Sequence, residues 1–216
     1  NQTQWYLHVK QSKNSTDGLD VGSYNYQACA LDTNNNNNCT EERIIEIITA
    51  INYITNCTNI TSPGTYYLQN DIIDSSITAC MNISANNVTL DCQGNTIDGD
   101  GVADYGIYSS RASIENTNLA VKNCVLTDWE TSAIYASKNQ NNTYENLIVN
   151  SNPDYGIHNI GSNDNKIINC TVENNRYGIA FFDGSSTGNQ IINSTVNNNS
   201  RFGLFLYGSG YQLRDL

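Results

Sequence analysis

Four short segments of the chain share one pattern of apolar and polar positions and follow each other at intervals of 23, 23 and 24 residues. Each begins with an apolar residue, continues with a position that accepts charge, as Lys122 and Glu145 show, and then has an asparagine. Strict alternation would put Lys122 and Glu145 on the apolar side, so we expect each strand to bend at the asparagine. Asparagine tolerates the left-handed backbone that such a corner needs, and its amide can bond to the next repeat. The segments are 121–126, 144–149, 167–172 and 191–196, and their asparagines are Asn123, Asn146, Asn169 and Asn193.

A second repeated segment follows the first and supplies another inward column. It reads DYGIY at 104–108, TSAIY at 131–135, DYGIH at 154–158, RYGIA at 176–180 and RFGLF at 201–205, with Ile107, Ile134, Ile157, Ile179 and Leu204 facing inward. A repeat of about two dozen residues with short strands and asparagine corners predicts one turn, or rung, of a β-solenoid. An antiparallel sandwich also has short strands, but its strands do not repeat at a near-constant step with a matched corner residue.

The chain also resembles a known group of proteins. The segments CTNITSPGTYYLQNDI at 57–72 and CMNISANNVTLDCQGNTIDG at 80–99 are similar to the start of the repeats in archaeal surface members of the NosD-like branch of the pectin-lyase-like superfamily. The resemblance covers about residues 57–210 and implies a right-handed parallel β-helix. It implies little about activity, because this superfamily contains lyases, hydrolases, adhesins and inert scaffolds.

We expect an all-β chain in three parts: an N-terminal extension over 1–40, a capping segment over 41–56 and the β-helix over 57–216. The capping segment is predicted to be an amphipathic α-helix over 41–54. Thr40 is a favourable N-cap, and Glu41 and Glu42 suit the first turn. Four isoleucines fall on one helical face, namely Ile44, Ile47, Ile48 and Ile51.

The two ends of the solenoid predict head-to-tail assembly into a homo-oligomer. The extension contains a strand-like segment, QWYLHVK at 4–10, and the last rung is apolar with only a short segment after it. A donor strand from one subunit would then cover the last rung of the next. The residues in this contact would be Trp5, Tyr6, Leu7 and Val9 against Leu204, Phe205, Leu206 and Tyr207. Alternatively, the chain is a fragment whose C-terminal cap is missing, or 4–10 pairs within its own subunit.

Composition and sequons indicate an extracellular or cell-surface glycoprotein. The net charge of −11 argues against nucleic acid or an anionic membrane as a partner, and no apolar run is long enough to span a bilayer. A start at Asn1 suits a mature chain after signal cleavage, although a trimmed chain would look the same. Of eleven Asn-x-Ser/Thr sequons, we expect Asn169 and Asn193 to stay unmodified because they lie in the corner ladder. The sequons expected to carry N-glycans are Asn1, Asn14, Asn38, Asn56, Asn59, Asn82, Asn87, Asn141 and Asn198.

The seven cysteines can be partly paired. Cys29 with Cys39, and Cys57 with Cys80, lie in the irregular N-terminal part, where closing a loop stabilises most. Cys124 and Cys170 lie two rungs apart, about 9.6 Å, beyond the roughly 7 Å limit for a disulfide, so we expect buried thiols there. Cys92 lies one long rung before Cys124 and either pairs with it or stays free. No C-x-x-C occurs, so we expect no zinc site.

Acidic and basic residues in the rungs assign no catalytic residue, metal site or cofactor. Asp154 and Arg176 share a column in adjacent rungs and are expected to form a structural ion pair. Asp98 and Asp100 could hold calcium, but one Asp-Gly turn is a weak signal. His8 and His158 are too isolated for a triad or a ligand cluster. The remaining candidates are Asp104, Asp128, Glu130, Arg111 and Arg201.

Aromatic residues repeat in two columns. The outward column is Tyr108, Tyr135, His158, Ala180 and Phe205, and its rings could stack on sugars or on a neighbouring subunit. We expect the second column, Tyr105, Tyr155, Tyr177 and Phe202, to fill the core. The sequence thus favours a structural subunit of an extracellular assembly, with glycan binding as the second hypothesis and a polysaccharide lyase or hydrolase as the third.

Overall fold

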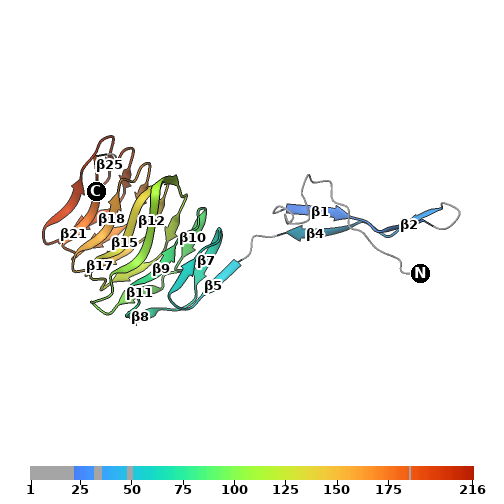
Figure 1. The fold of residues 1–216 in the computed structure, drawn as a ribbon, viewed down its shortest axis with the longest axis horizontal. Coiled ribbons are helices and arrows are strands. Elements are labelled where there is room, and N and C mark those ends of the chain that lie inside the picture. The colour runs from blue at the N-terminus through green and yellow to red at the C-terminus, as the bar shows by residue number, and fades with distance from the viewer. Residues whose placement is uncertain (1–21, 32–35, 48–50, 185) are drawn as a thin grey trace. The chain divides into compact units, whose positions relative to one another are not determined.

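The computed structural model describes residues 22–31, 36–47, 51–184 and 186–216, and all regular secondary structure in these ranges is β-strand. The chain divides into two units, Asn1–Ala50 and Ile51–Leu216 (Figure 1). The second unit contains the repeats. The strand-like segment 4–10, with Trp5, Tyr6, Leu7 and Val9, lies outside the described residues, as do Asn1 and Asn14.

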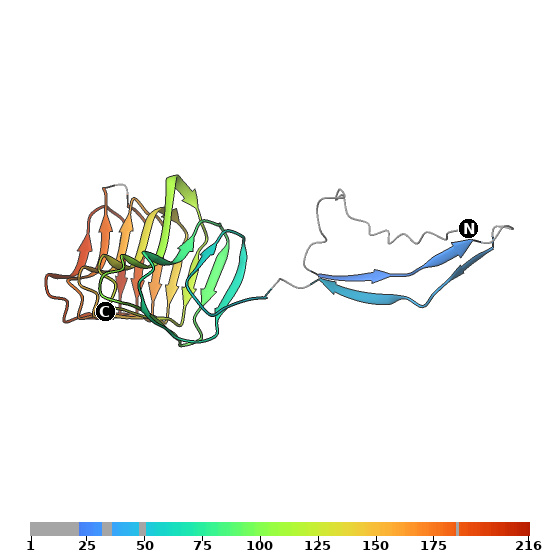
Figure 2. The ribbon, with the colours of Figure 1, turned by 60° about the horizontal axis from the view of Figure 1, so that its bottom comes forward.

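The second unit is a parallel β-helix of three sheets, which confirms the fold predicted from the repeat. Strands of successive rungs lie side by side and run in the same direction (Figure 2). Sheet 1 contains β5 (Ile51–Ile54), β7 (Gly64–Leu68), β10 (Val88–Asp91), β13 (Ala120–Lys122), β16 (Thr143–Glu145), β19 (Lys166–Ile168), β22 (Gln190–Ile192) and β25 (Gln212–Arg214). Sheet 2 contains β8 (Ile72–Ser75), β11 (Thr96–Gly99), β14 (Val125–Thr127), β17 (Ile148–Asn150), β20 (Thr171–Glu173) and β23 (Thr195–Asn197). Sheet 3 contains β6 (Thr58–Ile60), β9 (Ala79–Ile83), β12 (Tyr105–Asn116), β15 (Ser132–Gln140), β18 (Tyr155–Ile160), β21 (Tyr177–Phe182) and β24 (Phe202–Leu206).

The core consists of apolar columns, and each column is formed by the side chains at one strand position in successive rungs. In sheet 1, Val121 pairs with Tyr144, which pairs with Ile167, and all three are fully buried. In sheet 3, Ile107, Ile134, Ile157 and Ile179 are buried as predicted, and Leu204 at the end of the column is half-buried. Each side chain therefore packs against the same position in the rungs before and after it, and burial of these columns supplies the main apolar stabilisation.

The asparagine corner between sheets 1 and 2 also forms as predicted. Asn123, Asn146, Asn169 and Asn193 have φ values of 54°, 54°, 54° and 48°, which is the left-handed region. From Asn146 on, each amide donates from Nδ2 to Oδ1 of the preceding asparagine, over 3.1, 3.3 and 2.8 Å along the series. These amides form the outer ladder, which lies at the surface: all but the half-buried Asn123 are exposed. Beside it, Lys122 and Glu145 form an ion pair of 3.3 Å on the water-facing side.

Two further asparagine ladders lie inside the β-helix, and the sequence did not indicate them. Asn165 is fully buried: its backbone N–H donates to Oδ1 of Asn189 over 3.0 Å, and its own Oδ1 accepts the N–H of Asn142 over 2.9 Å. In the second inner ladder, the backbone N–H of Asn152 donates to Oδ1 of Asn175 over 3.0 Å. These inner ladders follow two other left-handed corners, which include Asn141 and Ser151. Their side-chain oxygens accept backbone N–H groups where the strands end, which pairs these buried donors, although Nδ2 of Asn142 has no partner among the described residues.

The predicted capping helix is wrong. Arg43–Ile47 is strand β4, which pairs antiparallel with β1 (Gly22–Tyr26), and Ile51–Ile54 is strand β5 of sheet 1. Isoleucine is stiff at χ1 and fits a pleated strand better than a helix, and β1 supplies a partner along the whole of β4. Thr40 is not an N-cap but bonds to Ala28 through its backbone N–H. The first unit also contains the pair β2 (Cys29–Leu31) and β3 (Asn37–Cys39).

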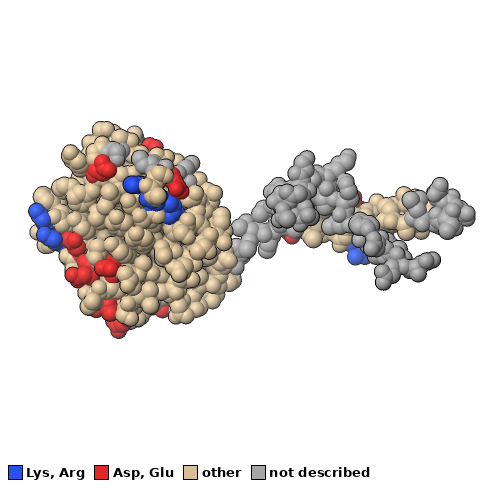
Figure 3. Space-filling view, in the orientation of Figure 1, with Lys and Arg blue, Asp and Glu red and all other residues tan. Residues whose placement is uncertain are grey.

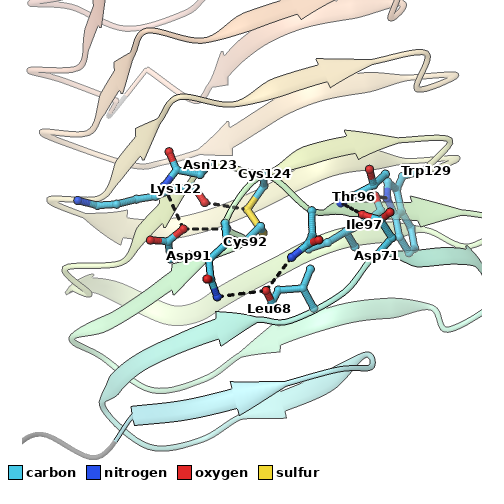
Figure 4. The surroundings of a disulfide bond; sticks show 12 residues. Leu68, Asp71, Asp91, Cys92, Thr96, Ile97, Lys122, Asn123, Cys124 and Trp129 are labelled. Carbon is cyan, nitrogen blue, oxygen red and sulfur yellow. Dashed lines mark hydrogen bonds between the residues drawn. A yellow bond between two sulfur atoms is a disulfide. The ribbon is translucent and has the colours of Figure 1, made fainter.

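Three disulfides are present among the described cysteines, and the two pairings expected from the sequence are among them. Cys29 bonds to Cys39 and Cys57 bonds to Cys80. The third bond joins Cys92 to Cys124 across adjacent rungs (Figure 4). Of the two alternatives left open for Cys92, pairing with Cys124 is the one that forms, so Cys124 is not the buried thiol that we expected. Cys170 is a buried free thiol, as predicted.

Hydrogen bonds around the third disulfide join three rungs. Asn123 donates from Nδ2 to the Asp91 carboxylate over 3.0 Å, and Asn95 donates to the carbonyl of Leu68 over 2.8 Å (Figure 4). The indole N–H of the buried Trp129 donates to the carbonyl of Ile97 over 3.1 Å. The early rungs are thus joined covalently and by side-chain hydrogen bonds.

Candidate binding face

Aromatic side chains from five strands of sheet 3 form a continuous surface, which we call the aromatic face. The strands hold the rings in register: Tyr108 of β12 pairs with Tyr135 of β15, which pairs with His158 of β18. Strand spacing in a sheet, about 4.8 Å, is close to the distance at which rings contact each other. The face consists of Tyr105, Tyr108, Tyr135, Tyr155, His158, Tyr177, Phe182, Phe202 and Phe205.

The rings pack on one another along the β-helix axis. Tyr108 and Tyr135 are nearly parallel, with centroids 5.3 Å apart and 7° between their planes. Tyr155 stacks on His158 at 4.1 Å and on Tyr177 at 4.6 Å. Such contacts restrict the side chains, so a ligand would meet a preformed apolar surface and cost little ordering entropy.

The prediction that the second aromatic column fills the core is wrong for Tyr105, Tyr155 and Phe202, which are half-buried or exposed, whereas Tyr177 is buried. Tyr105 contacts Tyr108 at 5.0 Å and Tyr155 contacts His158, so both columns lie on the same outer face. Tyr105 and Tyr155 are the first residues of their strands, where the chain leaves a corner and strict alternation does not yet hold. The next residue is glycine in most rungs. At Gly178 a Cβ would lie 2.6 Å from the carbonyl oxygen of Gly203, so a side chain does not fit.

Two arginines lie at one end of the aromatic face. The Arg201 guanidinium lies 5.3 Å from the Tyr177 ring centroid and 5.8 Å from that of Phe202. Arg176 lies 5.3 Å from Tyr177 and forms the predicted ion pair with Asp154 over 3.1 Å. This pair is partly exposed and contributes at most about 1 kcal/mol to stability. The arginines therefore border the apolar surface with cation–π contacts.

The rest of the aromatic face is uncharged at neutral pH. Burial lowers the pKa of His158 to about 4, so its ring is neutral, and burial raises the pKa of Tyr155. On the side of the β-helix that Figure 3 shows, most of the surface is neither acidic nor basic, and the charged side chains lie in small groups. The net charge of −11 is thus not concentrated into one acidic surface there.

The other end of the aromatic face opens into a hollow of about 310 Å³. Its walls are Thr78, Ala79 and Asn82 from the β9 side and the rings of Tyr105 and Tyr108. The small Ala79 is the strand partner of Tyr105, and Asn82 is the partner of Tyr108. The hollow exists because the aromatic columns stop at this rung.

Several of the acidic and basic candidates from the sequence make structural contacts within the rungs. Asp100 accepts the N–H groups of Val102 and Ala103, and these bonds lower its pKa. Arg111 donates to the carbonyl of Ile83 over 3.0 Å. The pKa of Asp98 is raised, chiefly by burial, with repulsion from Asp128 and Asp74 adding to it. In the described part of the chain, no three His, Cys, Asp or Glu side chains come together as a metal site would require.

The remaining predicted sites have the following environments. Leu204 and Leu206 are half-buried, Phe205 belongs to the aromatic face and Tyr207 is exposed. Asn82 is the one predicted glycan site in the described residues that is half-buried. The exposed ones are Asn38, Asn56, Asn59, Asn87, Asn141 and Asn198. Glycan occupancy and assembly stay predictions.

Three parallel sheets, stacked apolar columns and asparagine corners define a β-solenoid. A model of the right handed beta helix region matches residues 53–214, and the chain belongs to this family. Neither the curated proteins nor the solved structures contain a match. Within the described ranges, no helix is long and apolar enough to cross a membrane.

Proposed function

We propose that this protein is an extracellular glycoprotein of the cell surface whose β-helix binds a polysaccharide along the aromatic face. The main support is the row of aromatic rings on sheet 3, which hold one another in place by ring contacts. This row is apolar, uncharged at neutral pH and bordered by Arg176 and Arg201. The apolar faces of sugar rings pack on such surfaces. Three disulfides support an oxidising compartment.

Binding is tested with insoluble cellulose, chitin and mannan as probes. We expect the protein to sediment with at least one of them, and Phe202→Ala to weaken that binding about two- to twelvefold, because one ring contact contributes about 0.5–1.5 kcal/mol. Phe202 is 44% exposed and can be removed without opening the core. Tyr53→Ala is the matched control, since Tyr53 is exposed on sheet 1. Equal binding by both variants, or no binding of the unaltered protein to any probe, contradicts the proposal.

The self-assembling subunit expected from the sequence is a second proposal, supported by apolar surface near strands β24 and β25. Phe202, Tyr207 and Leu213 are 44%, 62% and 46% exposed there. Among the described strands, β24 and β25 each have a hydrogen-bonded neighbour on one side only, and such an edge accepts a further strand.

Assembly is tested by negative-stain microscopy of the purified chain with and without residues 1–10. We expect filaments from the full chain and single particles from the truncated one, because the rungs are complete without this segment while the donor strand is lost. Filaments from the truncated chain would show that 4–10 is not the donor. Circular dichroism of the truncated chain controls for folding.

A further inference from the structure

The stack of rings on sheet 3 ends at a defined place between β9 and β12. The outward column reads Asn59, Asn82, Tyr108 and Tyr135 in consecutive rungs. Tyr135 stacks on one side of the Tyr108 ring, while in β9 the strand partner of Tyr108 is the small Asn82, which lines the hollow with it. Tyr105 likewise has Ala79 as its partner in β9. Two ring surfaces are therefore left without an aromatic neighbour at this point.

Asn82 is both a wall of this hollow and a sequon, because Ser84 lies two residues after it. Its side chain points outward, whereas the neighbouring Ile83 is buried in the core and Ser84 is exposed. The Asn82 amide donates to Oδ1 of Asn59 over 3.0 Å. An amide has two N–H groups, so a substituted Nδ2 keeps one donor and this bond can persist.

We propose that Asn82 carries an N-glycan whose first sugar packs in the hollow against Tyr108 and Tyr105. The chain's own glycan, rather than a free polysaccharide, then occupies this end of the aromatic face. In the attachment step, Nδ2 of Asn82 attacks C1 of a sugar on a lipid-linked phosphate donor. The N–C bond forms, the C–O bond to phosphate breaks, the amide loses one proton, and the lipid phosphate leaves with the bonding electrons. The inference rests on the proposed glycoprotein character of the chain, and it leaves the part of the aromatic face bordered by Arg176 and Arg201 to the polysaccharide.

Asn59 provides an internal comparison, because it is a sequon in the same outward column one rung earlier. Its neighbour in β9 is Asn82, and Tyr108 lies two rungs away, about 9.6 Å at the spacing of strands in a sheet. A glycan on Asn59 would therefore start beyond contact with the ring. Packing of the first sugar on tyrosine is a property that the geometry gives to Asn82 and not to Asn59.

The test uses the full chain from a host that attaches N-glycans, with glycopeptide mapping followed by chemical nitration of exposed tyrosines. We expect Asn82 to be occupied and Tyr108 to be protected. Ser84→Ala removes the sequon but keeps the Asn82 amide, so it should increase nitration of Tyr108 several-fold. Asn59→Gln should leave it unchanged. Tyr53, which is 60% exposed, serves as the reference ring in every sample.

Two results would overturn the proposal: an unmodified Asn82 in the mapped protein, or a glycosylated Asn82 with equal nitration of Tyr108 before and after Ser84→Ala. Asn82→Gln adds a second check, since it should expose Tyr108 to the same extent as Ser84→Ala. Polysaccharide binding is measured separately on the unaltered chain and on Phe202→Ala, both with the Asn82 sequon intact. Absence of binding there contradicts the proposed function and leaves the nitration result for the Asn82 glycan unaffected.

Discussion

Replacing Asn165 with alanine is expected to lower the free energy of unfolding by about 2–4 kcal/mol, or roughly 4–16 °C in melting temperature. Asn165 is fully buried in the middle of an inner ladder. The substitution leaves the N–H of Asn142 without the Oδ1 that accepts it, and removes the side-chain bond to Asn189. An unpaired buried N–H costs the desolvation free energy of that group, and the lost amide volume leaves a small cavity.

Asn146→Ala is the matched control in the outer ladder. Asn146 makes two amide bonds as Asn165 does, but it is exposed, so water can replace its partners. Alanine in the left-handed corner conformation still costs about 1 kcal/mol. Thermal melts of both variants decide the comparison. A smaller loss for Asn165→Ala than for Asn146→Ala would mean that the inner ladder does not hold the rungs together.

Removing the disulfide between Cys92 and Cys124 should lower the free energy of unfolding by about 3.7 kcal/mol. The bond closes a segment of 32 residues and therefore restricts the unfolded chain. The double variant Cys92→Ala/Cys124→Ala keeps the buried positions apolar, so the effect should come mainly from the lost cross-link. Urea denaturation measures it.

Cys170→Ala is the control for this second prediction, because Cys170 is an equally buried thiol without a disulfide. It loses one sulfur atom and no cross-link, so its cost should stay near that of a small cavity, about 1 kcal/mol. If the double variant is no less stable than Cys170→Ala, the disulfide does not contribute through the unfolded chain.

The repeating parts of the fold could be predicted from the sequence, because every rung needs apolar side chains at the same inward positions and asparagine at the same corner. The inward columns and the outer asparagine ladder appear several times at one spacing, so errors at single positions cancel. The inner ladders were missed for the opposite reason. Asn142, Asn165 and Asn189 stand in runs of polar residues that look solvent-exposed, and only the closed corner shows that their amides are buried.

Two parts of the structure, the segment before the rungs and the aromatic face, could not be predicted from the pattern of apolar and polar residues. Their conformation depends on neighbouring strands and on strand ends, which that pattern does not show. Isoleucines at 44, 47, 48 and 51 fit one face of a helix. Arg43–Ile47 nevertheless forms strand β4, because β1 is available as its partner strand. The alternation rule placed Tyr105 and Tyr155 in the core because it assumes a straight strand, while both residues lie where a strand begins. The candidate face therefore became complete only with the ring contacts of the structure.

Because the rungs are nearly equal in length, such a chain can become longer by whole rungs. Residues 144–166 span one complete rung of 23 residues, from Tyr144 to the position before its equivalent, Ile167. A tandem copy of this segment would add one residue to each inward column and bring its own three corners. It would also add a second copy of the rings of Tyr155 and His158 to the aromatic face. Gene duplication within the repeat could thus lengthen the surface in whole-rung steps, while a shift of one or two residues would break every column at once.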